Sequence, residues 1–250
     1  MERDARLDPD DARMSAAADL RVRVAAANAA INDGGLVTLS FGNVSGVDRD
    51  AGVLVIKPSG VPYAELRPEM MVVIDLEGGQ VVDGELRPST DTPTHRFLYR
   101  TFPEIGGVVH THSSNATAWA QAGRSIPCLG TTHADYFRGS VPVSRPLRPE
   151  EIAGEYEWET GRVIAETLAA QGRTPTDAPA VLVGSHGPFA WGTSPEAAVE
   201  VAIALEAVAA MASATIALEA NVEQIGEELL GRHFDRKHGD NAYYGQRTRA

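Results

Sequence analysis

The sequence predicts a single α/β domain in layers around a central sheet, and three observations support this. Strand-like runs alternate with helix-like runs through most of the 250 residues, which is the order expected when helices cover a sheet. The length and the 43% apolar content suit one large core. No internal repeat or low-complexity linker divides the chain, so we expect one domain over residues 1–250, with residues 1–15 as an N-terminal extension.

The first half of the chain opens with a predicted helix. Residues 10–32 are rich in Ala, Arg, Met and Leu, and the Asp-Gly-Gly at 33–35 stops them. LVTLS (36–40) is typical of a strand, GNVSG (42–46) of a turn, and GVLVIK (52–57) of a second strand that ends at Pro-Ser-Gly. Residues 70–82 predict a hairpin, because two β-rich runs flank Glu-Gly-Gly.

The second half continues the alternation. After RPSTD, Ser89 or Thr90 can cap a helix with Pro93 in its first turn and residues 94–102 as its body. GGVVHTH (106–112) predicts a buried strand, and 116–123 a helix. Residues 150–171 predict one long helix, 178–187 a buried strand that ends in a turn, and 195–220 the longest helix. The apolar stripe of that last helix is typical of core or subunit packing.

Charge and composition exclude several classes of function. The net charge of -12 argues against nucleic acid and anionic lipid as partners. The basic residues are scattered apart from RHFDRKHGD at 232–240, which is typical of a solvated surface. We see no apolar stretch of the ~20 residues that a bilayer crossing needs and no signal peptide, so we expect a cytoplasmic protein. Its single cysteine, Cys128, cannot form an internal disulfide and suits a reducing compartment.

Three histidines make the strongest chemical pattern. His110 and His112 close the GGVV run, and residues two apart on a strand point to the same face. His186 follows the second buried run, VLVGS, and the ends of strands form the usual ligand crevice of an α/β sheet. Neutral imidazoles are good zinc ligands, and a catalytic site leaves one position open for substrate. The set therefore predicts a divalent metal ion, with Zn²⁺ favoured over Mg²⁺.

Polar, glycine-rich loops form the second pattern. They lie at Gly42-Asn43, at Lys57-Pro58-Ser59-Gly60 and at Ser89-Thr90-Asp91. Short polar side chains beside glycine leave backbone N–H groups exposed, and such concave segments bind anions without a basic surface. A helix that starts after Asp91 would add its N-terminal dipole. Their recurrence after successive strands favours a phosphate site.

These motifs carry a resemblance to a known family. LVTLSFGNVSGVDR, IKPSGVPY, PSTDTPTHRFLY, GGVVHTHS, GEYEWETG, SHGPFAWG and the C-terminal KHG..AYYGQ resemble the L-ribulose-5-phosphate 4-epimerases of the class II aldolase/adducin family, from about the first helix to Gln246. The resemblance implies a three-layer α/β/α domain with a mainly antiparallel or mixed sheet. It also implies a homotetramer with active sites at subunit interfaces, and a C-terminal tail, residues 236–250, that reaches the active site.

The resemblance also assigns roles to residues. It implies metal binding by Asp91, His110, His112 and His186. Asp135 and Tyr244 fall on the acid/base positions. Substrate-binding and supporting positions are Gly42, Asn43, Lys57, Ser59, Gly60, Ser89, Thr90, Thr131, Glu157 and His233. Two departures are mild: Thr90 replaces a serine, and Gly184 replaces a histidine two residues before His186. His95, His133 and His238 stay outside the metal set.

The implied reaction interconverts L-ribulose 5-phosphate and D-xylulose 5-phosphate by cleavage and re-formation of C3–C4. Because C4 is not adjacent to the carbonyl, proton removal next to C2 cannot invert it. Two acid/base groups are needed, since the C4 hydroxyl lies on opposite sides before and after. A class II sugar-phosphate aldolase that releases its fragments is the alternative, although related aldolases carry Glu where this chain has Asp91. A non-catalytic member of the fold is a further alternative, against which the histidine set speaks. The sequence does not distinguish an arabinose from an ascorbate pathway.

Overall fold

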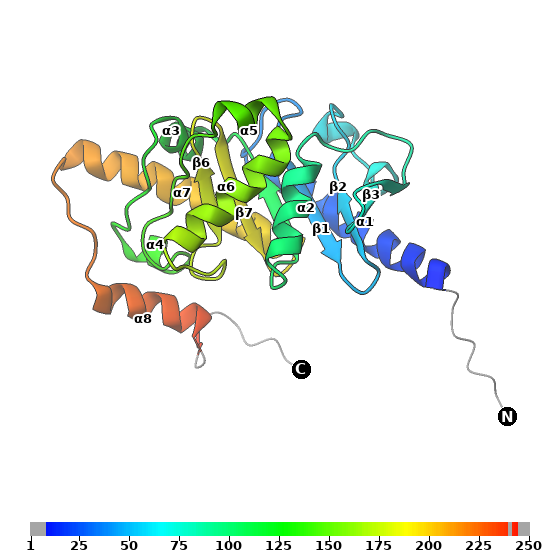
Figure 1. The fold of residues 1–250 in the computed structure, drawn as a ribbon. Coiled ribbons are helices and arrows are strands. Elements are labelled where there is room, and N and C mark those ends of the chain that lie inside the picture. Colours follow the sequence, from blue (N-terminus) through cyan, green and yellow to red (C-terminus); the bar gives the residue numbers. More distant parts are fainter. Residues whose placement is uncertain (1–8, 240–241, 245–250) are drawn as a thin grey trace.

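The protein is built around a central antiparallel sheet (Figure 1). The structure is a computed structural model and describes residues 9–239 and 242–244. The strand order is β4-β3-β2-β1-β5-β7-β6, and every neighbouring pair is antiparallel. The strands are β1 (Asn43–Asp48), β2 (Val53–Ile56), β3 (Val72–Asp75), β4 (Val81–Asp83), β5 (Gly107–His110), β6 (Ala180–Val183) and β7 (Gly187–Gly192). Of the two sheet types expected, antiparallel is therefore correct.

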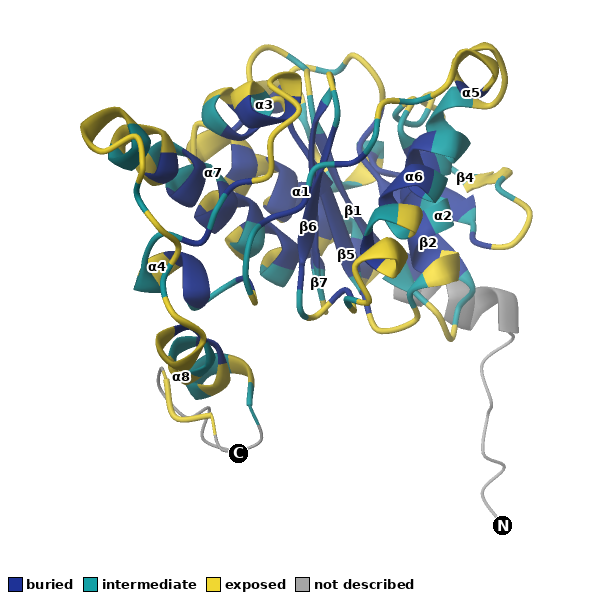
Figure 2. Ribbon diagram, turned by 60° about the vertical axis from the view of Figure 1, so that its left-hand side comes forward, coloured by how far each residue is buried: buried dark blue, intermediate teal, exposed yellow. Residues whose placement is uncertain are grey.

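Helices cover both faces of the sheet, as Figure 1 shows. On one face α1 (Pro9–Asp33), α3 (Ser114–Gln121) and α7 (Pro195–Leu218) pack with the sheet in one buried apolar cluster. On the other face α2 (Thr92–Thr101) and α6 (Tyr156–Ala170) close a second cluster. Figure 2 shows the buried strands between these layers. The predicted three-layer α/β/α domain is confirmed.

Shorter elements lie around this core. They are the 3-10 turns η1 (Tyr63–Glu65) and η2 (Pro68–Met70), and the helices α4 (Thr131–Ala134), α5 (Pro149–Ala153) and α8 (Glu227–His238). Helix α8 packs against α4 at the lower left of Figure 1. The expected N-terminal extension falls mostly outside the described residues.

Two predictions around β1 were wrong. LVTLS forms no strand, and Leu39 instead lies exposed at a positive φ of 57°. GNVSG, expected as a turn, is most of β1, because it pairs with β2 on one side and β5 on the other. Helix α1 lies so close that a Cβ at Gly46 would come within 2.8 Å of Leu20 Cδ1. The glycine therefore serves packing here rather than a turn.

Two helix predictions also need correction. The long helix expected at 150–171 is divided into α5 and α6, because the backbone of Gly154 leaves the helical region (φ -95°, ψ -132°). The N-cap residue of α2 is Asp91 rather than Ser89 or Thr90, and the Asp91 side chain makes no capping hydrogen bond. Ser89 contributes instead through its carbonyl, which accepts a bond from Thr92 Oγ1 at 2.6 Å.

Helix α7 contradicts the expectation that no segment could cross a membrane. It is long and apolar enough by length and composition, with a mean hydropathy of 2.0 over its best window. The test rests on length and composition alone; 28% of that window is buried, and α7 lies along β7 and β5. The face formed by Val199, Leu205 and Val208 belongs to the main apolar cluster.

Candidate metal centre and active site

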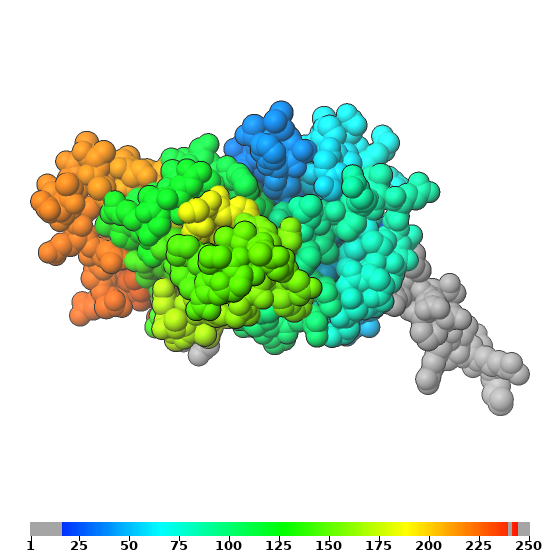
Figure 3. All heavy atoms as spheres, turned by 45° about the horizontal axis from the view of Figure 1, so that its top comes forward, coloured from blue at the N-terminus to red at the C-terminus, as the bar shows by residue number. Residues whose placement is uncertain are grey.

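The three predicted histidines meet where β5 and β6 end. We call this end of the strands the histidine edge. His110 is the last residue of β5, and His186 lies in the turn between β6 and β7. Because β5 and β6 are both antiparallel to β7, they run in the same direction and their ends share an edge. One ring nitrogen from each of His110, His112 and His186 lies within 4.8 Å of the others. Figure 3 views this edge, where the yellow segment between β6 and β7 reaches the surface.

Strand alternation does not explain the His110–His112 pair, because β5 already ends at His110. Their Nε2 atoms are nevertheless 3.1 Å apart. His110 is fixed by its Nδ1, which donates to the carbonyl of Pro188 at 3.0 Å, and by Phe189, whose ring stacks on it at 4.1 Å. The Nδ1 bond turns Nε2 toward the other histidines, which is how ligand imidazoles are commonly oriented.

The electrostatics of the cluster favour neutral imidazoles. The pKa of His186 is lowered to about 4, mainly by burial and further by the neighbouring His110 and His112, while Asp91 partly opposes the shift. Burial also lowers the pKa of His112, with His110 acting in the same direction. Neutral imidazole is the form that binds metal ions. The three residues therefore fit a divalent cation in geometry and in protonation state.

Asp91 lies beside this cluster but not within it. Asn43 Nδ2 donates to its Oδ2 at 2.6 Å. Burial would raise the pKa of Asp91, but the histidines around it and the Asn43 amide outweigh burial, so the pKa is lowered. Its carboxylate is thus held in the ionised form near His110 and His186. Its role as fourth metal ligand stays a prediction, since the cluster of close ligand atoms contains the histidines alone.

Two buried polar atoms next to Asp91 lack partners among the described residues. Asn43 Oδ1 has no hydrogen-bond partner, and neither has His95 Nε2. His95 is fully buried behind Asp91, and its Nδ1 lies 2.7 Å from Ser45 Oγ, which in turn meets Tyr99 at 2.8 Å. Unsatisfied buried polar groups are costly. Their position beside the histidines is consistent with a site that takes up a polar ligand.

The predicted anion-binding loops are joined to one another. Pro58 and Pro88 form an isolated antiparallel bridge. Ser59 N donates to Arg87 O at 2.9 Å, and Ser89 N donates to Lys57 O at 3.0 Å. Asn43 Nδ2 donates to Ser89 Oγ at 3.0 Å. Because Asn43 pairs with His110, this bond connects the loops to the histidine edge. Ser59 and Gly60 remain exposed, as does Thr90. Gly42 adopts φ +79°, and a Cβ there would come within 2.9 Å of His110 O.

Lys57 is buried between these loops. Its side chain is among the largest that are fully buried, and its Nζ donates to Ser40 O at 3.2 Å. The ammonium lies 4.9 Å from the centre of the Tyr63 ring. Burial lowers its pKa, although Asp91 partly opposes this. The ammonium group of a buried lysine has lost much of its hydration, and a bound anion can replace it. Lys57, beside the glycine-rich loops, is therefore suited to bind an anion.

The remaining predicted residues gather elsewhere, around α4 and α8. Thr131 starts α4, and Asp135 directly follows that helix. Asp135 Oδ1 accepts a bond from His233 Nδ1 at 3.0 Å. Tyr244 is exposed beyond the end of α8. Glu157, by contrast, lies on α6, where its carbonyl accepts a bond from Thr94 Oγ1 at 2.5 Å.

This second group lies near the other end of the strands β5 and β7, away from the histidines. Tyr136, which follows Asp135, lines a cavity of about 210 Å³ together with Ile105 before β5 and Gly192 at the end of β7. A strand rises ~3.3 Å per residue, so the six residues of β7 separate the two ends of the strand by roughly 16 Å. An aspartate side chain cannot span that distance, so Asp135 cannot reach the histidines of its own chain.

Sequence reasoning missed two residues of these groups. Tyr156 places its hydroxyl 3.3 Å from Nδ1 of His186, and its signal was the GEYEWETG motif. Arg236 donates to both carboxylate oxygens of Asp135, at 2.9 and 2.7 Å. It belongs to RHFDRKHGD, so the interpretation of that segment as a merely solvated surface was wrong.

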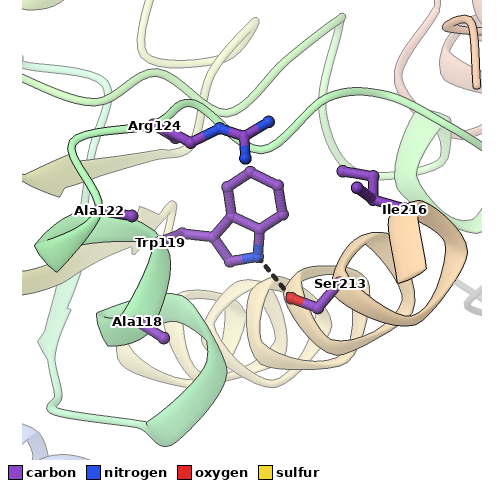
Figure 4. Close-up of a pocket in the computed structure, with 6 residues that line it drawn as sticks. All are labelled: Ala118, Trp119, Ala122, Arg124, Ser213 and Ile216. Atoms are coloured by element: carbon purple, nitrogen blue, oxygen red, sulfur yellow. Dashed lines mark hydrogen bonds between the residues drawn. The ribbon is translucent and has the colours of Figure 1, made fainter. Parts of the chain in front are cut away.

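Another cavity, of about 260 Å³, lies between α3 and α7 (Figure 4). Trp119 dominates it and donates through Nε1 to Ser213 Oγ at 2.9 Å, while Arg124 lies 5.2 Å from its ring centre. The other lining residues are Ala118, Ala122 and Ile216. With no acid, base or metal ligand among its lining residues, this cavity is not a candidate for the chemistry.

Comparison with known proteins agrees with the fold. The fold is that of class II aldolases, whose solved structures match nearly the whole chain. An L-fuculose 1-phosphate aldolase superposes with a TM-score of 0.73 at 22% identity, covering 87% of this chain and 95% of that one. YgbL from Klebsiella pneumoniae gives 0.67 at 26% identity, covering 86% and 97%. The L-fuculose 1-phosphate aldolase of Glaciozyma antarctica PI12 gives 0.71 at 18% identity, covering 94% and 86%.

The family assignment follows from a match to a family model. The model described as Class II Aldolase and Adducin N-terminal domain matches residues 22–213. The chain therefore belongs to the class II aldolase and adducin family. That match includes the three histidines, the joined loops and Asp135, and it ends before α8.

Proposed function

We propose that this protein is a metal-dependent epimerase that interconverts L-ribulose 5-phosphate and D-xylulose 5-phosphate. The observation that carries the proposal is the state of Asp91, whose carboxylate is fixed by Asn43 at 2.6 Å beside the histidines. A short, immobilised carboxylate is suited to bind a metal ion rather than to move a proton. The acid/base roles then belong to Asp135 and Tyr244, as the sequence resemblance implies.

The histidine edge would hold the metal ion, with His110, His112 and His186 as ligands and Asp91 as the fourth. A divalent ion there, which we propose is Zn²⁺, supplies Lewis-acid stabilisation of the charge that develops on the C2 and C3 oxygens. Lys57 and the joined loops bind the phosphate. Ser59, Gly60 and Thr90 are exposed at the surface of these loops and are free to contact it.

The protons are handled by the second group. Asp135 takes the proton from the C4 hydroxyl as the C3–C4 bond breaks, which leaves an aldehyde on the fragment that carries the phosphate. The loops keep the phosphate bound while the aldehyde turns its other face. When C3–C4 re-forms, Tyr244 gives a proton to the new C4 oxygen. A proton then passes from Asp135 to Tyr244 by way of solvent before the next turnover, so atoms and charge balance, and the product differs only at C4.

The separation of the two groups supports a site shared between subunits. Asp135 and Tyr244 lie at the opposite edge from the histidines, so both must serve the metal site of a neighbouring chain. We therefore propose a cytoplasmic homotetramer with active sites at subunit interfaces. The exposed side chains of Leu39 and Phe41, 77% and 53% accessible beside the histidine edge, suit such a contact.

The alternative is an aldolase that releases both fragments, a function favoured by two similar structures, which are L-fuculose 1-phosphate aldolases. One assay separates the two functions. The Zn²⁺-loaded protein is incubated with L-ribulose 5-phosphate, and D-xylulose 5-phosphate and free glycolaldehyde phosphate are measured in parallel. The epimerase forms the first without the second. Release of the aldehyde in step with substrate loss would assign an aldolase, and no turnover of either kind would refute the proposal.

A further inference from the structure

The carboxylate of Asp135 is almost completely engaged by α8. Arg236 donates to Oδ1 through Nε and to Oδ2 through a terminal nitrogen, and His233 donates to Oδ1. A carboxylate oxygen accepts about two hydrogen bonds. Oδ1 is therefore saturated, and among residues 9–239 and 242–244 nothing occupies the second lone pair of Oδ2. His238 adds a bond to the Asp135 carbonyl at 2.9 Å, which fixes the backbone as well.

The same arginine also holds the tail that carries Tyr244. Its guanidinium lies 4.7 Å from the centre of the Tyr244 ring, within the range of a cation–π contact. Its carbonyl accepts bonds from the N–H groups of Tyr243 and Tyr244, at 2.9 and 3.0 Å. The chain thus turns back after α8 and returns to Arg236. Asp135 and Tyr244, more than a hundred positions apart in the sequence, contact one side chain.

The charges around Asp135 come from the elements packed on α4. Helix α8 contributes His233, Arg236 and Lys237, and α7 contributes Glu200, to which Lys237 is bonded at 2.9 Å. Lys237 is thus satisfied by Glu200, while Arg236 directs its charge to Asp135. Burial would raise the pKa of Asp135, but Arg236 and His233 outweigh burial and lower it.

We propose that Arg236 is the positioning residue for both acid/base groups, directing Oδ2 of Asp135 and the ring of Tyr244 toward the substrate as one unit. This inference rests on the proposed function. Arg236 itself transfers no proton, because a guanidinium stays charged at every working pH. It keeps Asp135 ionised, leaves one oxygen free for the proton, and fixes the distance between the two groups.

The kinetic test compares Arg236→Ala and Arg236→Lys with Arg232→Ala, which removes an exposed arginine one turn earlier on the same helix. Loss of positioning should lower the kcat of Arg236→Ala about 10²-fold, with KM and Zn²⁺ content unchanged. The acidic limb of its kcat profile should move to higher pH, because Arg236 is among the groups that lower the pKa of Asp135. Added guanidinium should restore part of kcat in Arg236→Ala. A kcat and a pH profile equal to those of Arg232→Ala would overturn the inference.

A second readout does not need activity. The carboxyl carbon of Asp135 is followed by ¹³C NMR as pH changes, and its signal is identified by its loss in Asp135→Asn. Arg236→Ala should raise its titration midpoint, and Arg236→Lys should leave it closer to wild type. An unchanged midpoint in Arg236→Ala refutes the role of Arg236. If the wild-type protein shows no epimerase activity, the proposed function fails, and the titration decides the role of Arg236 by itself.

Discussion

The shared site can be tested by combining two inactive chains. His110→Asn removes a metal ligand and Tyr244→Phe removes an acid/base group, and each alone should lower kcat at least about 10²-fold. The two residues lie at opposite ends of the strands. The Tyr244→Phe chain therefore keeps an intact set of histidines, and the His110→Asn chain keeps an intact Tyr244. In randomly mixed oligomers from equal amounts, about one quarter of the sites combine an intact histidine edge with an intact Tyr244. We therefore expect recovery to about one quarter of wild-type activity.

The two chains are co-expressed with different tags, and subunit mixing is verified by native mass spectrometry before the epimerase assay. Mixing His110→Asn with His186→Asn is the matched control, because both changes damage the same edge and no intact site can form. Activity near one quarter in the first mixture and none in the second supports the shared site. Verified mixing without recovery would show that the geometric argument is wrong.

Three further predictions concern the metal ligands, the phosphate loops and the stability of the fold. His186→Asn should lose most bound Zn²⁺ in metal analysis, whereas the exposed His238→Asn should keep it; because the pKa of His186 is about 4, the wild type should still hold metal at pH 5.5. Ser59→Ala and Ser89→Ala should each raise KM for the phosphorylated sugar about tenfold, the effect of one lost charged hydrogen bond, and unchanged kinetics in both would remove the phosphate site. Glu151→Gln should lower Tm at pH 7. Glu151 lies on α5, outside the candidate site, and accepts bonds from Arg145 at both carboxylate oxygens, at 2.8 and 2.7 Å. These bonds lower the pKa of Glu151 to about 2. Its stabilisation is therefore present at neutral pH and should fade as pH falls toward 2; an equal Tm difference at pH 2.5 would contradict this.

The sequence predicted the fold class, and the three histidines that it singled out lie together. The alternation of β-rich and helical runs indicated the layers. His110 and His186 lie close together because His110 ends the buried strand β5 and His186 follows the buried strand β6. The errors have a common cause, which is tertiary contact overriding local pattern. GNVSG contains turn residues, yet it forms a central strand because Asn28 of α1 bonds both the N–H and the carbonyl of Val44.

Long-range polar contacts were beyond the reach of local patterns. Nothing near RHFDRKHGD indicates that Arg236 bonds a carboxylate 101 positions away. The resemblance supplied the role of Asp135, but periodicity could not show that it lies across the sheet from the histidines. That separation depends on the path of the chain after α3, which contains few regular elements to predict.

The position of Asp135 and Tyr244 across the sheet has a consequence for how the protein is handled. On the proposed shared site, a lone subunit is folded and binds its metal ion but lacks half of its chemistry. Specific activity should then fall on dilution while circular dichroism and metal content stay constant, and it should return on concentration. Rate would become a measure of subunit association, so that any cellular change in protein abundance near the dissociation constant would alter turnover more than proportionally.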